Sequence, residues 1–509
     1  MLSSFRPCLL LAFILTAGCA AHPPPSGALA AHTTAASPAV RQLQADLSAV
    51  FGAQVTAHGT WAVDVRSLRS GETLYRLNAE KLMMPASNMK IVTMAAAAEV
   101  LGWNHRFTTT LETFAPIVDG VLEGDLIVRG TGDPTINNRE QRSIRVLDDW
   151  AAALRQAGIS RIAGRVVGDD QAFDDEGIGA GWAWDYLQYG YAAPVGALQF
   201  NENVATLGVR PGAVEGAPAD VTLTAGSGFV MVNRTFTGPA DSPETIDYRR
   251  RLDRPVLEIT GSVPLASGEQ TRVVARNVAV VNPTEYFVQS LKDGLVARGI
   301  TVAGEAVDMD DIAAELVSAS LPDRRVLATA ESPTLHEMGI VLMKVSQNLY
   351  AETLLKAAGA ARGGLGTAPA GRRAFASVLE GWGIPPDTYV MYDGSGLSRY
   401  NYLTAAGLTN ILERMQRDDR HRDAFAATLP IAGQDGTLSM RMRGSLADGN
   451  ALAKTGSIAN VRALSGYVQT RDGEPLVFSM LTNDFVVPSA TVNWMADLGV
   501  EILAGFSRR

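Results

Sequence analysis

The order of apolar and polar positions changes character several times along the chain. Near the N-terminal end, residues 61–65 and 73–75 alternate apolar and polar positions around Ser70-Gly71, which predicts a β-hairpin. The run from Met89 to Leu101 is apolar on every side. A helix with no polar face is buried within a protein, so this run predicts a central helix that begins just after Ser87.

From about Phe107 the pattern is mainly that of strands. Short stretches rich in β-branched residues alternate with Gly, Pro and Asn turns, and helical patterns are found at 146–158 and 286–299. This predicts a long β-rich insert, in which residues 204–263 are strand-like enough to form a small domain of their own. The expected strands are 124–128, 204–209, 221–223, 256–259 and 271–280.

Helical patterns return after about Leu335, and the chain closes with two strands and a helix. Because a hairpin and a buried helix lie at one end and further helices and strands at the other, one α/β (α+β) domain is predicted to be split by the insert. The later helices are expected at 336–361, 372–383, 403–418 and 489–504, and the strands at 463–470 and 476–481. The predicted boundaries are 1–19 (signal peptide), 20–39 (flexible linker), 40–106 (split domain, first part), 107–203 (insert), 204–263 (nested domain), 264–315 (insert, continued) and 316–509 (split domain, second part).

The first residues are typical of an export signal. Arg6 precedes the apolar stretch Cys8–Ala17, which is too short to anchor the chain across a bilayer. The following Leu15-Thr16-Ala17-Gly18-Cys19 is similar to a bacterial lipobox, although Thr stands where such boxes usually carry Leu. We therefore expect a periplasmic protein, attached to the outer membrane if Cys19 carries a lipid. The alternative is plain secretion with cleavage after Ala21.

Composition excludes several classes of function. With 509 residues, 47% hydrophobic and 19% charged, the chain is globular and large enough for several domains. A formal net charge of −9 argues against a nucleic-acid partner. Both cysteines, Cys8 and Cys19, fall in or beside the signal, so the exported chain has no disulfide. The six histidines show no metal-ligand spacing and no G-x-S-x-G is present, so we expect no metal, no cofactor and no Ser-His-Asp triad.

Lysine is rare, and two of the six lysines fall in short motifs. Lys90 closes Ser87-Asn88-Met89-Lys90, and Lys454 opens Lys454-Thr455-Gly456. Ser87 and Lys90 would share one helix face, where a buried lysine can act as a base toward the serine. Burial and a nearby cation such as Lys454 would lower the pKa of Lys90 enough for this. The alternative is an ordinary surface serine and lysine.

Two further motifs lie in the second half of the chain. Ser346-Gln347-Asn348 falls inside helical sequence that runs from Met343 to Leu355. Lys454-Thr455-Gly456-Ser457 precedes strand-like sequence, and a glycine on a strand beside a cleft lets a substrate backbone approach closely. Taken singly, Ser346 and Asn348 could be solvent-facing polar residues of a helix, and Lys454-Thr455-Gly456 could be a polar hairpin turn.

In this order, S-x-x-K, S-x-N and K-T-G resemble the active-site set of penicillin-binding proteins and serine β-lactamases. The wide gap before Ser346 is similar to the D-alanyl-D-alanine carboxypeptidase/endopeptidase family of low-molecular-mass penicillin-binding proteins (class C type). The resemblance implies a penicillin-binding/β-lactamase-like transpeptidase domain split by a β-rich two-domain insertion. Further matching stretches are Gly130-Thr131-Gly132-Asp133-Pro134, Gly181-Trp182-Ala183-Trp184-Asp185, Ala193-Pro194, Asp393-Gly394-Ser395-Gly396-Leu397-Ser398-Arg399, Gly433-Gln434-Asp435-Gly436-Thr437-Leu438 and Leu464-Ser465-Gly466-Tyr467.

The resemblance also implies a role for each motif residue in cutting peptidoglycan stem peptides. Ser87 would attack the D-Ala-D-Ala or cross-link carbonyl with Lys90 as the base. Ser346 would relay a proton to the leaving amine, and Asn348 would hold the peptide.

The remaining implied residues bind the substrate. Lys454 and Thr455 would hold its carboxylate side, Gly456 would let it approach the strand, and the backbone N–H groups of Ser87 and Ser457 would form the oxyanion hole.

Two further positions each have an alternative interpretation. Arg399 matches a family position near the cleft, the alternative being a surface salt bridge. Similar proteins often carry a carboxylate directly after the residue aligned with Asp185, where it reaches the diamino acid of the stem peptide; here that place is Tyr186. Either Asp185 substitutes for it, or recognition of the side-chain amine is weaker.

The implied partners are peptidoglycan stem peptides as substrates and β-lactam antibiotics as covalent inhibitors. Two other functions are alternatives. A serine β-lactamase would use the same chemistry with fast deacylation, but the large insert and the lack of a Glu-containing deacylation loop speak against it. A catalytically silent wall-binding scaffold would not need three intact motifs. The preference for the terminal D-Ala or the cross-link stays open.

Overall fold

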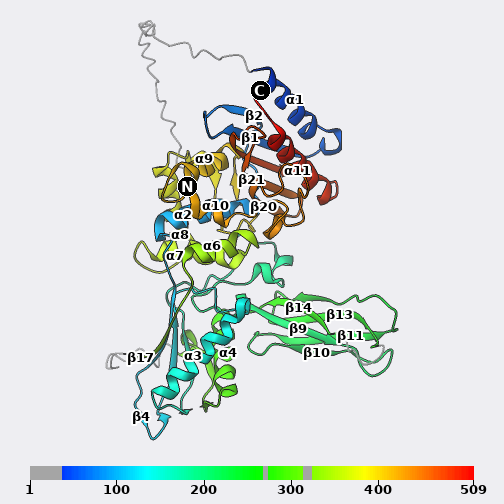
Figure 1. The fold of residues 1–509 in the computed structure, drawn as a ribbon. Coiled ribbons are helices and arrows are strands. Elements are labelled where there is room, and N and C mark those ends of the chain that lie inside the picture. The colour runs from blue at the N-terminus through cyan, green and yellow to red at the C-terminus, as the bar shows by residue number, and fades with distance from the viewer. Residues whose placement is uncertain (1–36, 267–272, 313–323) are drawn as a thin grey trace, which may run out of the picture. The chain divides into compact units, whose positions relative to one another are not determined.

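A single antiparallel sheet joins the two ends of the chain in the computed structural model (Figure 1), which describes residues 37–266, 273–312 and 324–509. Strands β1 and β2 form the predicted hairpin, and β1 pairs along its whole length with β22. The sheet therefore needs both ends of the sequence. In spatial order its strands are β2 (Thr73–Leu77), β1 (Thr60–Ser67), β22 (Pro475–Asn483), β21 (Val461–Gln469) and β20 (Leu452–Ile458).

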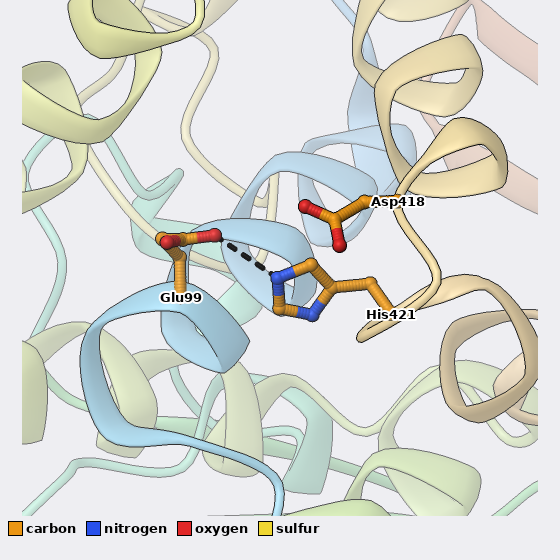
Figure 2. A group of neighbouring side chains, drawn as sticks. All are labelled: Glu99, Asp418 and His421. Atoms are coloured by element: carbon orange, nitrogen blue, oxygen red, sulfur yellow. Dashed lines mark hydrogen bonds and ion pairs between the residues drawn. The ribbon is translucent and has the colours of Figure 1, made fainter.

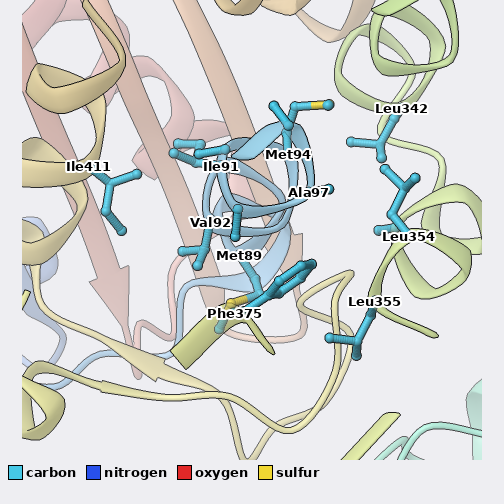
Figure 3. Packing of buried hydrophobic residues seen from close by; sticks show 14 of the residues in the cluster. Met89, Ile91, Val92, Met94, Ala97, Leu342, Leu354, Leu355, Phe375 and Ile411 are labelled. Carbon is cyan, nitrogen blue, oxygen red and sulfur yellow. The ribbon is translucent and has the colours of Figure 1, made fainter. Parts of the chain in front are cut away.

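The predicted buried helix is α2 (Met89–Leu101), and every residue from Met89 to Ala98 is buried. Figure 3 shows its side chains surrounded by apolar residues of other helices, among them Leu342, Leu355 and Phe375. Each such fully buried aliphatic or aromatic side chain contributes about 1.5–3 kcal/mol. The surrounding helices are α6 (Leu335–Lys344), α7 (Asn348–Ala360), α8 (Ala368–Gly381), α9 (Ala405–Arg417) and α10 (Arg422–Thr428).

Two helices cover the other face of the sheet. In β22, Leu481 belongs to the core around α2, whereas a Cβ on Gly499 of α11 (Ser489–Gly505) would lie 3.1 Å from Met480 and 2.8 Å from Phe51 of α1 (Pro38–Phe51). Because successive strand residues point to opposite faces, α1 and α11 lie on one face and α2 on the other. Helix α1 has no counterpart among the predicted elements.

The insert begins and ends on paired strands. β3 (Thr108–Thr113) and β17 (Arg325–Glu331) are antiparallel, with Thr108 opposite Glu331, so the chain enters and leaves the insert side by side. Neither strand was predicted, whereas the predicted strand and helices inside the insert are confirmed as β6, α3 and α4. The neighbouring elements are β6 (Leu126–Gly130), β8 (Val166–Asp169), β16 (Ala306–Asp308), α3 (Arg142–Gln156), α4 (Pro283–Ala297) and the short strands β4 (Ile117–Val118), β5 (Val121–Leu122), β7 (Arg161–Ile162) and β15 (Thr301–Val302).

Two three-stranded sheets form a small sandwich within the insert. Leu207 of one sheet and Ile259 of the other belong to the same buried apolar cluster, which confirms the strand-rich character expected there. The strands are β10 (Asp220–Leu223), β9 (Val204–Arg210) and β14 (Val274–Ala279) in one sheet, and β11 (Val230–Gly238), β13 (Val256–Pro264) and β12 (Asp247–Arg250) in the other.

Some of the predicted domain boundaries lie outside the described residues. The signal peptide, Cys19 and the linker up to residue 36 lie outside them. Pro38, inside the predicted linker, already begins α1, and β14 lies beyond the predicted end of the nested domain at 263. The described residues from Pro38 onward belong to one compact unit, so the division into domains stays a prediction. Among the described helices, none combines the length and apolar character needed to cross a bilayer.

Candidate active site

Ser87 lies in a tight turn that two glycines hold in place. The turn is a 3-10 segment, Ala86–Asn88, directly before α2, and Ala86 has a positive φ of 46°. A Cβ on Gly396 would be 1.8 Å from the Ala86 carbonyl oxygen, and one on Gly456 would be 2.7 Å from that of Pro85. Only residues without a side chain fit there, so the strained turn is clamped between the Gly396 loop and the edge strand β20.

The amine of Lys90 has three partners. Nζ lies 3.0 Å from Ser87 Oγ, 2.6 Å from Asn348 Oδ1 and 2.7 Å from the Ser395 carbonyl oxygen. Asn348 donates from Nδ2 to the Tyr191 carbonyl oxygen at 2.7 Å, which fixes its Oδ1 toward the lysine. A neutral lysine amine has two N–H groups and one lone pair. The two carbonyl oxygens take the two N–H groups, and the lone pair then faces Ser87 Oγ–H.

Burial is the main cause of the lowered basicity of Lys90. Its side chain is fully buried, and this lowers the pKa of Lys90 to about 7, against the opposing effect of Asp393 and Glu352. Burial, rather than the nearby cation Lys454 named in the sequence analysis, is the largest cause for Lys90. Burial and then the charge of Lys90 lower the pKa of Lys454 well below its usual range. Two buried cations this close disfavour each other's charge.

Lys454 joins the K-T-G strand to the second motif. It lies in β20 with its side chain fully buried, and Nζ donates to Ser346 Oγ at 2.9 Å and to the Thr455 carbonyl oxygen at 3.0 Å. Asn88 Nδ2 donates to the Lys454 carbonyl oxygen at 2.9 Å. The residue after Ser87 therefore connects the Ser87 turn to the strand that carries Lys454.

The placement of Ser346 inside a helix was wrong. The predicted helix 336–361 is two helices, α6 and α7, and Ser346 between them has a positive φ of 61°. The Gln347 side chain caps α7 by accepting from Leu349 N at 3.1 Å, so the new helix begins at Asn348. This break turns Ser346 toward Lys454, which a continuous helix would not do.

Two buried carboxylates hold the loop behind Lys90. Glu352, one turn after Asn348 on α7, accepts from the backbone N–H groups of Gly394 at 3.0 Å and Ser395 at 2.7 Å. Burial, and then the negative charge of Asp393, raise the pKa of Glu352. The carbonyl of Ser395 is thereby fixed where Lys90 donates to it.

Asp393 is the second carboxylate of this loop. It accepts from the N–H groups of Gly396 at 2.8 Å and Ser398 at 2.6 Å, from Asn401 Nδ2 at 2.6 Å and from Trp182 Nε1 at 2.8 Å. Sequence reasoning gave neither carboxylate a role. The signal was present, because Glu352 is an acidic residue four positions after Asn348 in the predicted helix.

A cavity of about 490 Å³ opens in front of Ser87. It combines predicted site residues with others that the sequence did not indicate, and Thr437 accepts a hydrogen bond from Thr455 there at 2.8 Å between the two hydroxyl oxygens. Lys344, near the second motif, forms an ion pair with Asp435 in the same loop as Thr437. The predicted lining residues are Ser87, Ser346, Asn348, Thr455 and Ser457, and the additional ones are Tyr186, Tyr191, Gly396, Leu397, Thr437, Ile458, Ala459, Asn460, Arg462 and Ser489.

Arg399 and Asp185 do not line this cavity. Arg399 Nη1 donates at 3.1 Å to the carbonyl oxygen of Ala459, which is itself a lining residue, so the guanidinium lies at the rim. Asp185 is exposed in the short 3-10 segment Trp184–Tyr186, and its neighbour Tyr186 is the residue that lines the cavity. The structure thus brings the three motifs together and leaves these two residues outside.

One group of possible metal ligands lies away from the cavity and is hydrogen-bonded within itself. Figure 2 shows His421 with Nε2 3.0 Å from Glu99 Oε2, beside Asp418. The other ring nitrogen accepts from Trp103 Nε1 at 3.1 Å. Both nitrogens of His421 are occupied, so the group serves to tie the end of α2 to the segment between α9 and α10.

The known proteins that this chain resembles share one described activity. Residues 43–502 match the sequence profile described as the D-Ala-D-Ala carboxypeptidase 3 (S13) family. The chain is 34% identical over 476 residues to a D-alanyl-D-alanine carboxypeptidase of Actinomadura sp. (strain R39), covering 91% of this chain and 85% of the relative. It is 27% identical over 433 residues to D-alanyl-D-alanine carboxypeptidase DacB of Haemophilus influenzae, covering 82% and 84%.

A solved structure supports the same fold. The crystal structure of penicillin binding protein 4 (dacB) from Haemophilus influenzae superposes with a TM-score of 0.76 at 24% identity, covering 92% of this chain and 99% of that one. The predicted fold class, a penicillin-binding/β-lactamase-like α/β (α+β) domain with a β-rich insertion, is confirmed.

The close packing of Gly396 against the Ser87 turn leads to a prediction about stability. Gly396→Ala places a methyl group against the Ala86 carbonyl, whereas Gly363 has a similar φ of 88° but open space around its Cβ position. We expect Gly396→Ala to lower the free energy of unfolding by about 1–3 kcal/mol more than Gly363→Ala does. Denaturant unfolding of both variants measures this, and equal losses would contradict the clamp.

The charge of Glu352 makes a prediction about Lys90. Glu352→Gln removes a negative charge that favours the ammonium form, so the pKa of Lys90 should fall below about 7. Because the chain has only six lysines, a pH titration followed by NMR of ¹³C-labelled lysine can resolve this amine. Glu123→Gln, at an exposed position in the insert, is the control and should leave it unchanged. An unchanged or raised pKa in Glu352→Gln would refute the assignment.

Proposed function

The chain belongs to the D-Ala-D-Ala carboxypeptidase 3 (S13) family, and from this premise we propose that Ser87 is the nucleophile of a serine-type D-Ala-D-Ala carboxypeptidase acting on peptidoglycan stem peptides. The observation that carries the assignment is the position of the Lys90 amine. It lies 3.0 Å from Ser87 Oγ, and its other two contacts are both carbonyl oxygens. A lysine held in this way is a base directed at one hydroxyl.

Acylation follows from this arrangement. Neutral Lys90 takes the proton of Ser87 as Oγ attacks the carbonyl carbon between the two D-alanines. The C–N bond then breaks, and the proton that Lys90 took from Ser87 is relayed through the hydroxyl of Ser346, which Lys454 contacts, to the leaving amine. The backbone N–H groups of Ser87 and Ser457 stabilise the oxyanion. Because only the neutral amine is a base, the acylation rate rises as the pH increases through about 7.

Deacylation completes the cycle. Water attacks the ester carbonyl of the acyl-enzyme, the Ser87 Oγ–C bond breaks, and the shortened peptide leaves with a new carboxyl group while Ser87 regains its proton. The net reaction consumes one water and releases one D-alanine. A cross-link has the same D-Ala carbonyl, so endopeptidase cleavage would use the same residues.

Other parts of the site hold the substrate. Asn348 and Thr455 line the cavity on either side of Ser87, and Gly456 leaves room for a peptide backbone beside the edge strand. Arg399 and Asp185 stand at or outside the rim, where they would meet only an extended stem peptide.

We place the enzyme in the periplasm, with a lipid on Cys19 as its tether to the outer membrane. The domain boundaries given above are proposed to separate the split catalytic domain from its insert.

β-Lactams are proposed as covalent inhibitors through the same serine. A penicillin binding protein 4 of Haemophilus influenzae, similar in fold, has been solved in complex with a β-lactam. The second candidate function, a serine β-lactamase, differs only in how fast the acyl-enzyme hydrolyses. The third, a silent scaffold, would have no use for a buried, desolvated Lys90.

The nucleophile and base can be tested together. Ser87→Ala and Lys90→Ala should each reduce D-Ala release from a D-Ala-D-Ala stem peptide by at least about 1000-fold, since the activated hydroxyl is lost. Lys292→Ala is the control, because Lys292 lies in the insert, where it donates to the Gly304 carbonyl at 2.9 Å. Undiminished release by Ser87→Ala would refute the mechanism.

Penicillin distinguishes the peptidase from the β-lactamase. We expect labelled penicillin to remain on the protein after gel filtration and tryptic mapping to find it on Ser87. Intact mass should show one acyl group that persists for many minutes. Rapid release of hydrolysed penicillin with catalytic turnover would instead identify a β-lactamase.

A further inference from the structure

Arg462 is a cation in the wall of the catalytic cavity that the motifs do not account for. It lies on β21, lines the cavity and is half-buried. Among the described residues, no carboxylate lies within 4.0 Å of its guanidinium, in contrast to the nearby Arg441, which pairs with Asp497 at 2.6 Å. A guanidinium at this depth usually has an anionic partner.

The hydrogen bonds of Arg462 all go to neutral acceptors. Nη1 donates to the carbonyl oxygens of Ile458 at 2.8 Å and Val461 at 2.6 Å, and Nη2 donates to Ser489 Oγ at 2.5 Å. These contacts hold the guanidinium in one place without neutralising it. Burial, and then the charge of Arg441, lower the pKa of Arg462, as expected where positive charge is uncompensated.

The register of the sheet places this cation beside two hydroxyls of the cavity. Ser457 of β20 is directly opposite Arg462 of β21, so their side chains leave the sheet on the same face about 5 Å apart at Cβ. Thr455, two residues before Ser457, is on that face as well. Lys454 and Gly456 alternate with them: the Lys454 amine reaches Ser346 Oγ, and the Cβ position of Gly456 faces the Ser87 turn.

We propose that Arg462 recognises the free carboxylate of the leaving D-alanine, together with the hydroxyls of Thr455 and Ser457. The inference rests on the proposed function, because it places the scissile carbonyl at Ser87. Two neutral hydroxyls alone would leave the carboxylate unpaired in a partly desolvated cavity, and a fixed guanidinium supplies charge-assisted hydrogen bonds. Arg462 is thus a specificity-determining residue that selects substrates ending in a carboxylate.

The competing interpretation is that Arg462 only braces the turn between β20 and β21 through Ile458 and Val461. The two interpretations differ in one measurable respect. A brace affects every substrate alike, whereas a carboxylate partner affects only substrates that carry the carboxylate.

The test compares kcat/KM for a diacylated tripeptide ending in D-Ala-D-Ala with its C-terminal amide. For Arg462→Gln we expect a loss of at least tenfold with the acid and less than threefold with the amide, while Arg462→Lys keeps an intermediate activity toward the acid. Arg441→Gln, which removes a positive charge outside the cavity, should change neither substrate by more than threefold.

Two other outcomes would overturn the role proposed for Arg462. Equal losses with acid and amide would leave Arg462 as a brace, and no loss with either would remove it from the site. If the wild-type protein released no D-alanine and took up no penicillin on Ser87, the proposed function itself would fail. That result is distinct from a failure of the Arg462 variants in an active enzyme.

Discussion

Burial of the Lys90 amine is the constraint on which the rest of the active site depends. An ammonium group with no access to water is costly, and the cost is relieved when the amine is neutral and its N–H groups meet carbonyl oxygens. Asn348 and Ser395 provide those oxygens. They come from separate parts of the chain, so the packing of α2 against α7 and the loop after β18 (Tyr389–Val390) must be accurate for the lysine to be usable as a base.

The insert contributes to this accuracy although it lies far from Ser87 in sequence. Trp182 donates to Asp393, which orders the loop behind Lys90, and the carbonyl of Tyr191 orients Asn348. Tyr186 and Tyr191 also line the cavity. The insert therefore acts on the site through hydrogen bonds to Asp393 and Asn348, which help to position the surroundings of the Lys90 amine, and through the wall of the cavity.

The sequence predicted the elements with strong patterns well and the irregular ones poorly. The hairpin of β1 and β2 and the buried helix α2 follow from periodicity and apolar content, which are local properties. The joint between α6 and α7 was missed because Ser346 adopts a left-handed backbone that ordinary helix propensity does not signal. β3 is rich in threonine, and its pairing with β17 across the insert is set by tertiary contacts.

For the site, the sequence by itself singled out the candidate residues Ser87, Lys90, Ser346, Asn348 and Lys454 by motif, order and spacing. What only the tertiary structure decided is how they interact. Glu352 and Arg462 lie outside the quoted motifs, and Asp393 lies in a matching stretch that gave it no role, because their influence is electrostatic and depends on burial and on distances between strands and loops that are remote in sequence. Local patterns encode residue types and periodicity, whereas pKa values and partners arise only once the chain has folded around them.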